Sequence, residues 1–163
     1  MKTALDTGAA RGIGLATTKL FLEDGWQVAM IARDGDALAD AVTSLDRVYG
    51  INCDVSDPGS VTGMMSETLK TYGRIDALVN NAGVADFGPI EETTVERWRT
   101  VMETNLDGPF LVTQAAISAL KDTKGAIVNI ASISGLRAST LRVTYGKTKA
   151  GLIQLPSKRE GDV

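Results

Sequence analysis

Residues 2–14 have the sequence Lys-Thr-Ala-Leu-Asp-Thr-Gly-Ala-Ala-Arg-Gly-Ile-Gly. Lys2 to Asp6 form a short strand candidate that runs directly into glycines, and a helical pattern of apolar residues begins at Leu15. Glycines let the backbone turn tightly and approach a pyrophosphate, which then binds the free N–H groups at the helix N-terminus. The stretch therefore predicts the first half of a βαβ unit and a dinucleotide site in the turn that contains Gly8, Arg11, Gly12, Ile13 and Gly14.

Strand and helix candidates alternate along the rest of the chain without repeats, linkers or low-complexity segments. The alternation predicts an α/β fold, a doubly wound Rossmann-type parallel sheet with strand order 3-2-1-4-5, in a single domain over residues 1–163. The further strand candidates are residues 27–32, 47–53, 76–80 and 126–131. The further helix candidates are residues 34–45, 58–72 with Ser56 or Asp57 as N-cap and Gly73 as its end, a long helix from Thr93 towards Leu120, and one that begins near Thr144.

Composition limits the classes of protein that the chain can belong to. With 163 residues, 44% of them hydrophobic, it can bury one sizeable core. The net charge of -3 and the scattered Lys and Arg argue against a nucleic-acid partner. The longest apolar run, Val28 to Ala32, is too short for a membrane span. The single Cys53 excludes an internal disulfide and fits a reducing compartment, so we expect a cytoplasmic protein.

The chain has no histidine, which excludes Ser-His-Asp and Cys-His catalysis and a histidine-based metal site. Proton chemistry must then fall to Tyr, Lys, Asp or Glu. Tyr145 and Lys149 are four residues apart and share one face of a helix that begins near Thr144. An ammonium about 4 Å from a phenol can supply roughly the 4 kcal/mol that brings its pKa from about 10 towards neutrality. Alternatively, the pair is part of a solvated helix face.

Two charged residues follow the second strand candidate, about twenty residues after the glycine turn. At this place a dinucleotide fold contacts the adenine ribose: an acid holds the 2′-hydroxyl of NAD, and an arginine accommodates the 2′-phosphate of NADP. Arg33 comes first, and Arg11 can add a second positive charge, so the sequence favours NADP(H). Asp34 keeps NAD(H) open. The alternative is that both residues only start the next helix.

The long helix candidate carries a polar residue on its apolar stripe. Thr93 and Glu96 match a capping box at its start. Asn105 lies on the stripe, and Pro109 has no N–H to donate to the Asn105 carbonyl. We expect a kink there that leaves a backbone oxygen free to bind a water, or else an ordinary proline kink beside a buried amide.

Together these motifs resemble those of the short-chain dehydrogenase/reductase family, over residues 2 to about 155. The resemblance implies an oxidoreductase that moves a hydride between NAD(P)(H) and a small alcohol or ketone, assembled as a homodimer or homotetramer. In that family a serine precedes the tyrosine by about thirteen residues, which selects Ser132 over Ser134. The motifs are Thr7-Gly8-xxx-Gly12-x-Gly14, Asp54, Asn80-Asn81-Ala82-Gly83, Asn105, Ser132 and Tyr145-xxx-Lys149.

The resemblance also implies a role for each residue. Tyr145 would exchange a proton with the substrate oxygen, and Ser132 would hydrogen-bond that oxygen. Lys149 would lower the pKa of Tyr145 and hold the nicotinamide ribose, and the Asn105 carbonyl would hold a water that relays protons to Lys149. The other residues expected along the cofactor are Asp54, Val55, Asn81, Ala82 and Gly83.

Two features depart from that family's pattern. The chain breaks at Pro156, where the family continues with units that close the substrate pocket; we therefore expect a truncated or frame-shifted copy that lacks them after about residue 155 and leaves the fifth strand as an uncovered edge. Asp6 stands in the central strand, where it predicts a costly buried carboxylate. Two other functions stay open: a catalytically silent nucleotide-binding or dimerising module, and a sugar-nucleotide epimerase, which the glycine spacing fits less well.

Overall fold

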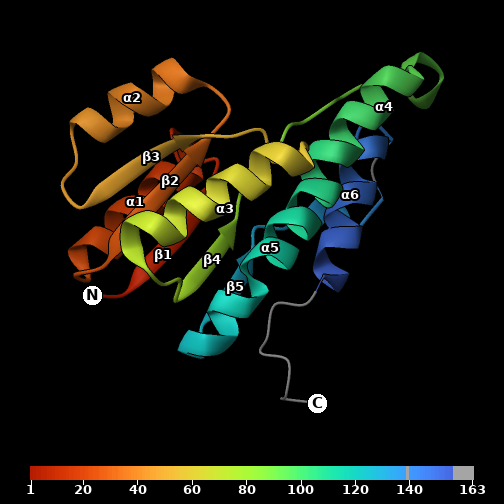
Figure 1. The fold of residues 1–163 in the computed structure, drawn as a ribbon. Coiled ribbons are helices and arrows are strands. Elements are labelled where there is room, and N and C mark those ends of the chain that lie inside the picture. Colours follow the sequence, from red (N-terminus) through yellow and green to blue (C-terminus); the bar gives the residue numbers. More distant parts are fainter. Residues whose placement is uncertain (139, 156–163) are drawn as a thin grey trace.

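A computed structural model describes residues 1–138 and 140–155, so the predicted break at Pro156 lies outside the described residues. Five parallel strands form one sheet in the order β3-β2-β1-β4-β5, with helices on both faces (Figure 1), which confirms the predicted fold class and strand order. The elements are β1 (Thr3–Thr7), α1 (Gly12–Glu23), β2 (Gln27–Ala32), α2 (Gly35–Thr43), β3 (Val48–Asn52), α3 (Pro58–Tyr72), β4 (Ala77–Asn80), η1 (Ile90–Glu92), α4 (Val95–Met102), η2 (Glu103–Asp107), α5 (Gly108–Thr123), β5 (Ala126–Asn129), η3 (Ile133–Gly135) and α6 (Val143–Gln154).

The strands direct alternate side chains into two cores. Leu5 of β1 and Ile31 of β2 belong to the core that contains side chains of α3 and α5. Ala4 and Met30, their neighbours on the same strands, belong to the core that contains side chains of α1 and α2. A parallel sheet that is buried on both faces needs strands that are apolar almost throughout, and for this reason the continuous run in β2 identified that strand correctly.

Local capping signals mark both ends of α3 and the start of α2 at the residues where the sequence predicts them. Asp57 caps α3 by accepting the N–H of Ser60 at 2.6 Å, and Gly73 ends the helix with φ at 71°. Asp34 caps α2 through the N–H of Ala37 at 3.1 Å. These caps depend on residues that are near in the sequence, so they can be recognised without the fold.

The predicted capping box at Thr93 is wrong by one residue. The N-cap of α4 is Thr94, whose hydroxyl oxygen accepts the N–H of Arg97 at 3.2 Å. Thr93 follows the 3₁₀ turn η1, and its hydroxyl donates to the carbonyl of Pro89 at 3.2 Å. The preceding turn therefore engages the first threonine and leaves the second to start the helix.

Before Pro109 the structure has a π-helical turn that the sequence did not predict. Residues 103–107 form the π-helical turn η2, in which the N–H of Gly108 bonds to the carbonyl of Glu103, and α5 continues from there. Pro109 has no N–H for the ordinary ladder, and a π turn absorbs this by shifting the bonding by one residue. The turn buries the Asn105 side chain completely.

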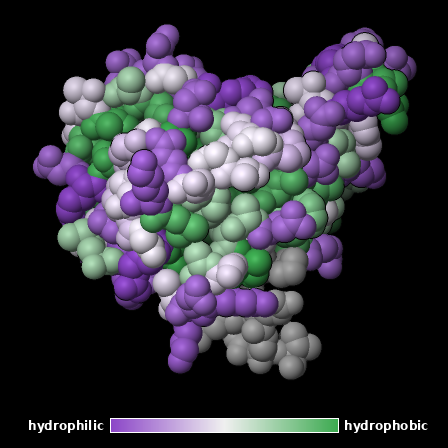
Figure 2. Space-filling view, viewed as in Figure 1, coloured by the Kyte–Doolittle hydropathy of each residue, from purple (hydrophilic) through white to green (hydrophobic). Residues whose placement is uncertain are grey.

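The helices α4 and α5 together make a long rod beside α6, and α4 projects beyond the sheet (Figure 1). On the face shown in Figure 2, the projecting end of α4 is mostly hydrophilic, and hydrophobic and hydrophilic residues are mixed elsewhere. No helix in the described residues is both long enough and apolar enough to cross a membrane.

The outer strand β5 has one covered and one open face. Ile127 is buried in the core beside α5, whereas Val128, the next residue, has 46% of its surface exposed. Within residues 1–138 and 140–155, β5 pairs only with β4, so it is the edge strand that the sequence predicts.

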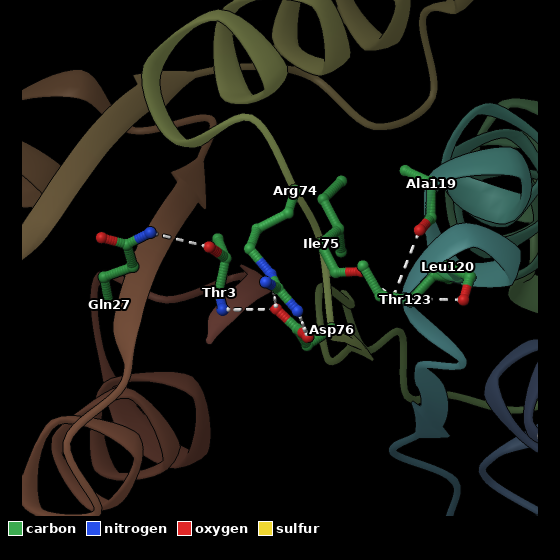
Figure 3. Close-up of polar contacts among 8 residues, drawn as sticks. All are labelled: Thr3, Gln27, Arg74, Ile75, Asp76, Ala119, Leu120 and Thr123. Carbon is green, nitrogen blue, oxygen red and sulfur yellow. Dashed lines mark hydrogen bonds and ion pairs between the residues drawn. The ribbon is translucent and has the colours of Figure 1, made fainter. Parts of the chain in front are cut away.

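A polar network joins the amino ends of β1 and β4 (Figure 3). Asp76, which is 8% exposed, accepts the backbone N–H of Thr3 at 2.9 Å and two N–H groups of Arg74 at 2.9 and 2.6 Å. The hydroxyl of Thr123, at the end of α5, donates to the carbonyl of Ile75 at 2.6 Å. Burial alone would raise the pKa of Asp76, but the hydrogen bonds and the charge of Arg74 lower it below its usual value.

We expect Asp76→Asn to lower the free energy of unfolding at neutral pH by about 2 kcal/mol, because an amide cannot accept the three bonds as well. A carboxylate with a lowered pKa stabilises the protein above its unfolded pKa near 4, and this contribution is lost as pH falls through the folded value. Urea midpoints of the native protein and the variant should therefore converge on acidification. Asp122→Asn, at an exposed carboxylate of α5, is the control, and a constant difference at all pH values would contradict the prediction.

Candidate active site

The glycine turn between β1 and α1 packs tightly against the loop after β4. Gly8 has φ at 70°, and a Cβ atom there would lie 2.8 Å from Nδ2 of Asn81. A Cβ atom on Gly14 would lie 2.4 Å from the carbonyl oxygen of Gly8. Packing therefore excludes a larger residue at both positions, and at Gly8 the backbone conformation also disfavours one.

The helix end beside this turn is open to a ligand. Arg11 is the N-cap of α1 and makes no side-chain cap hydrogen bond. Gly12 has φ at 58°, and, apart from its chain neighbours and the backbone of its own helix, no atom of the described residues lies within 4 Å of the position of its missing Cβ. The first-turn N–H groups thus lack a capping side chain and adjoin open space. This arrangement fits a pyrophosphate, whose oxygens can accept these N–H groups at the positive end of the helix dipole.

Thr7 connects the two loops, a role that its place at the start of the glycine motif did not reveal. Its hydroxyl donates to the carbonyl of Val79 at 3.1 Å and accepts the N–H groups of Asn81 and Ala82, each at 3.0 Å. The Asn81 amide in turn donates to the carbonyls of Thr7 and Gly8 at 2.8 and 3.2 Å. The Asn-Asn-Ala-Gly segment is therefore a support for the glycine turn, and only its position after the fourth strand signalled this.

A cleft of about 620 Å³ lies at the carboxyl ends of the strands, where the fold class places ligands. It brings together nine residues that the sequence predicts for the cofactor, and Thr104 adds a residue that was not predicted. Gly12, Gly14 and the four predicted catalytic residues are not among its lining residues. The nine are Gly8, Arg11, Ile13, Arg33, Asp54, Val55, Asn81, Ala82 and Gly83.

Two arginines that line the cleft each approach a carboxylate. Arg11 lies 3.6 Å from Asp34, and Arg33 lies 3.8 Å from Asp54, with all four side chains substantially exposed. The Asp54 carboxylate accepts the hydroxyl and the N–H of Ser56 at 2.6 and 3.0 Å. The side-chain bond from Ser56 is the main reason that the pKa of Asp54 lies below its usual value, and Arg33 adds to the effect.

Tyr145 and Lys149 lie on the same face of α6, as the four-residue spacing predicts. The Lys149 Nζ atom lies 5.7 Å from the centre of the Tyr145 ring. It also donates to the carbonyl of Ile130, just after β5, at 2.7 Å. Lys149 is 4% exposed, and burial lowers the pKa of its ammonium. The position of a Cβ on Gly83 would be 3.7 Å from Nζ, which places the pair next to the loop that lines the cleft.

Asn105 binds that loop through its side chain. Its Oδ1 accepts the N–H of Val84 and its Nδ2 donates to the carbonyl of Val84, both at 2.8 Å. The same Nδ2 donates to the hydroxyl of Thr148 at 3.2 Å, and Thr148 donates to the carbonyl of Tyr145 at 2.8 Å. Thr148 is therefore a second residue that the sequence analysis missed. Its position immediately before Lys149 was the only available signal.

Ser132 lies on a loop that packs closely against α6. Its hydroxyl oxygen accepts the N–H of Ser134 at 3.1 Å, as the N-cap of η3. A Cβ on Gly146 would lie 2.9 Å from the carbonyl oxygen of Ser134, and a Cβ on Gly135 would lie 2.7 Å from the backbone of Lys149. Two glycines thus let the serine loop approach the helix that carries Tyr145.

With this geometry in place, comparison with known proteins identifies the family. The profile described as short chain dehydrogenase matches residues 2–160. The chain belongs to the short chain dehydrogenase family. It is 37% identical over 159 residues to "Granaticin polyketide synthase putative ketoacyl reductase 1" of Streptomyces violaceoruber, covering 93% of this chain and 58% of the relative. It is 34% identical over 163 residues to "NADP-dependent (R)-specific alcohol dehydrogenase" of Lentilactobacillus kefiri, covering 96% of this chain and 64% of the relative.

Solved structures of family members have the same fold. An actinorhodin polyketide ketoreductase variant with NADPH superposes with a TM-score of 0.90 at 33% identity, over 94% of this chain and 61% of that one. The chain thus spans less than two thirds of the length of these relatives. The likeness supports the family and the Rossmann-type nucleotide-binding fold.

Proposed function

We propose that this member of the family is an NADP(H)-dependent oxidoreductase that acts on an alcohol or carbonyl group. The observation that carries the proposal is the position of Gly83 between the cleft and the predicted catalytic residues. Gly83 lines the cleft, and the position of its missing Cβ is 3.3 Å from Asn105 Oδ1 and 3.7 Å from Lys149 Nζ. The cleft proposed for the nucleotide is thus adjacent to the Tyr145–Lys149 pair, in which Lys149 is buried and Tyr145 is partly exposed. Bound NADP(H) would supply or accept the hydride.

The residues of the chain would handle the proton and the orientation of the substrate. The Tyr145 phenol would give its proton to a carbonyl oxygen during reduction, or take it from a hydroxyl during oxidation. Ser132 would hydrogen-bond the same oxygen. The Lys149 ammonium, one helical turn away, would place its positive charge near the reacting groups. Asn105 would act as a positioning residue, because its side chain ties the Val84 backbone to Thr148 in the Tyr145 helix.

The pyrophosphate of the cofactor would bind the open N-terminus of α1, and its adenine would lie beside Asp54 and Val55. The preference for NADP(H) over NAD(H) is supported by the state of Asp34. Its carboxylate already caps α2 and lies near Arg11, which leaves it less able to accept a ribose hydroxyl. Arg11 and Arg33 both line the cleft, and there they would pair with a 2′-phosphate.

We expect Arg33→Ala to weaken NADPH binding about 30-fold and NADH binding less than threefold, since a charge-assisted bond to phosphate contributes about 2 kcal/mol. Calorimetric titration of each cofactor measures both constants. Lys19→Ala removes one positive charge from α1 outside the cleft lining and serves as the control. Equal losses for both cofactors would contradict the assignment of Arg33.

The proposed activity is tested by adding a panel of small ketones to the chain with NADPH and following cofactor oxidation. We expect oxidation that depends on the ketone, and the reverse reaction with NADP⁺ and the matching alcohol. If the chain binds NADPH tightly but oxidises it with none of these ketones, it acts as a nucleotide-binding module, the second function considered from the sequence.

A further inference from the structure

An aromatic ring and a guanidinium group lie beside Tyr145, and the proposed reaction uses neither of them. The centre of the Phe87 ring is 6.3 Å from the centre of the Tyr145 ring. The guanidinium carbon of Arg142 is 5.1 Å from the centre of the Phe87 ring. Arg142 is the N-cap of α6, so it precedes Tyr145 by three residues on the same element. The three side chains form one contiguous group next to the atoms proposed for proton transfer.

Contacts with the flanking loops hold Arg142 in this place. Its Nη1 donates to the hydroxyl oxygen of Ser134 at 3.4 Å, and the N–H of Ser134 donates to the Ser132 hydroxyl oxygen. The N–H of Gly88 donates to the carbonyl of Leu141 at 3.1 Å, which joins the Phe87 loop to the start of α6. Hydrogen bonds through Ser134 therefore connect the Arg142 guanidinium to the Ser132 hydroxyl, which is proposed to bind the reacting oxygen.

No carboxylate among the described residues neutralises the charge of Arg142. In the part of the chain that the structure describes, Arg142 has no carboxylate within ion-pair distance, in contrast to Arg11, Arg33, Arg74 and Arg97. The acid closest in sequence to Phe87 is Asp86, and two N–H groups of Arg97 occupy it. An exposed arginine that is oriented by an aromatic ring and lacks an acidic partner can bind an oxyanion through its remaining N–H groups.

We propose that Arg142 binds an anionic group of the substrate, so that the substrate is a ketone or secondary alcohol that carries a carboxylate or a phosphate. This inference rests on the proposed function. The reacting oxygen would lie at Tyr145 and Ser132, the oxyanion at Arg142, and the carbon chain between them against Phe87, which is 55% exposed. Arginine suits this role because its planar group bonds two oxygens of one anion at once.

The test compares substrates that differ only in charge. Acetoacetate and methyl acetoacetate have the same reacting ketone, and dihydroxyacetone phosphate and dihydroxyacetone form the corresponding phosphate pair. We expect the native chain to favour the anionic member of at least one pair by about tenfold or more in kcat/KM. Which pair shows the preference distinguishes a carboxylate substrate from a phosphate substrate. In Arg142→Gln the ratio of anionic to neutral kcat/KM should fall about tenfold, mainly through KM, and Arg142→Lys should restore part of it.

Arg137→Gln removes the same charge from the loop after η3 and is the matched control. A fall of the same size in this variant would show a general field effect and overturn the assignment. Equal kcat/KM of the native chain for charged and neutral ketones would also overturn the assignment of Arg142. That turnover would still support the proposed oxidoreductase function. If no ketone is reduced, calorimetry with butyrate, butyramide and inorganic phosphate on the NADP⁺-loaded chain decides. Binding of either anion that Arg142→Gln abolishes supports the subsite, and its absence refutes it.

Discussion

Replacing Asp6 with valine is expected to raise the free energy of unfolding at pH 7 by about 3 kcal/mol. Asp6 is completely buried in the central strand, and the one hydrogen-bond partner of its side chain among the described residues is Thr18, whose hydroxyl donates to Oδ2 at 3.0 Å. Its Oδ1 has no hydrogen-bond partner, and in the described residues no cation pairs with it. Burial raises the pKa of Asp6 to about 8, and the bond from Thr18 offsets only part of this rise.

The magnitude follows from the difference between the folded and unfolded pKa. Keeping the carboxyl protonated at pH 7, when an unfolded aspartate has a pKa of about 3.9, costs about 4 kcal/mol. Valine removes this cost and has a shape that suits a strand. Loss of the hydrogen bond from Thr18 lowers the stability by about 1 kcal/mol, which leaves the net gain given above. Thr18 can then donate to a carbonyl of its own helix instead.

The sign of the pH dependence is opposite to that of Asp76. Because the folded pKa is raised, the native state holds a proton that the unfolded state has lost, so stability falls as pH rises from about 4 to about 8 and then levels off. We expect Asp6→Val to remove this slope, so that the gap between variant and native protein grows with pH. Urea midpoints at about pH 5 and about pH 8 measure it. Asp40→Val, at an exposed site in α2, is the control, and an unchanged midpoint in Asp6→Val would refute the prediction.

Tyr145→Phe is expected to lower kcat for ketone reduction by about a thousandfold, the size typical of losing a general acid. The variant keeps the ring, which packs 6.3 Å from the ring of Phe87, so only the hydroxyl and its proton are removed. Steady-state rates with NADPH and the best ketone of the panel give kcat directly. The thermal midpoint should stay close to that of the native chain, because no hydrogen bond of the Tyr145 hydroxyl is present in the described structure to be lost.

A matched change elsewhere separates chemistry from folding. Tyr49→Phe also removes one hydroxyl, from a tyrosine on β3 that donates to Glu67 and does not line the cleft. It should leave kcat unchanged. If Tyr145→Phe and Tyr49→Phe keep the same kcat, the proton role of Tyr145 is wrong even if the chain reduces ketones.

Several parts of the fold could be predicted because they depend on neighbours in the sequence. The apolar run of β2, the cap at Asp57 and the glycine at position 73 each act within a few residues, so the structure has them where the sequence puts them. The capping box at Thr93 failed because the turn η1 engages that hydroxyl, and a turn of this kind leaves no periodic signal. The π turn before Pro109 was not predicted for a related reason. A helix can accommodate the missing N–H of a proline with several hydrogen-bonding patterns, and tertiary packing decides which one forms.

In the candidate site, too, the residues could be predicted from the sequence but their contacts could not. Each site residue follows a strand or lies on a helix with a recognisable motif, and parallel strands bring such positions to one edge of the sheet. Their partners were not recognisable. Lys149 donates to Ile130, Asn105 clamps Val84, and Arg142 lies over Phe87.

From the sequence alone follow the sheet, its strand order, the glycine turn and the shared face of Tyr145 and Lys149, because periodicity, chain reversal at glycine and helical spacing act along the backbone. Only the tertiary structure decides which polar groups are satisfied. Among the described residues, Asp6 keeps one oxygen without a hydrogen-bond partner, and Arg142 has no carboxylate within ion-pair distance. Those outcomes depend on distances of a few ångströms between residues far apart in the chain, and such distances are set by how the two cores pack.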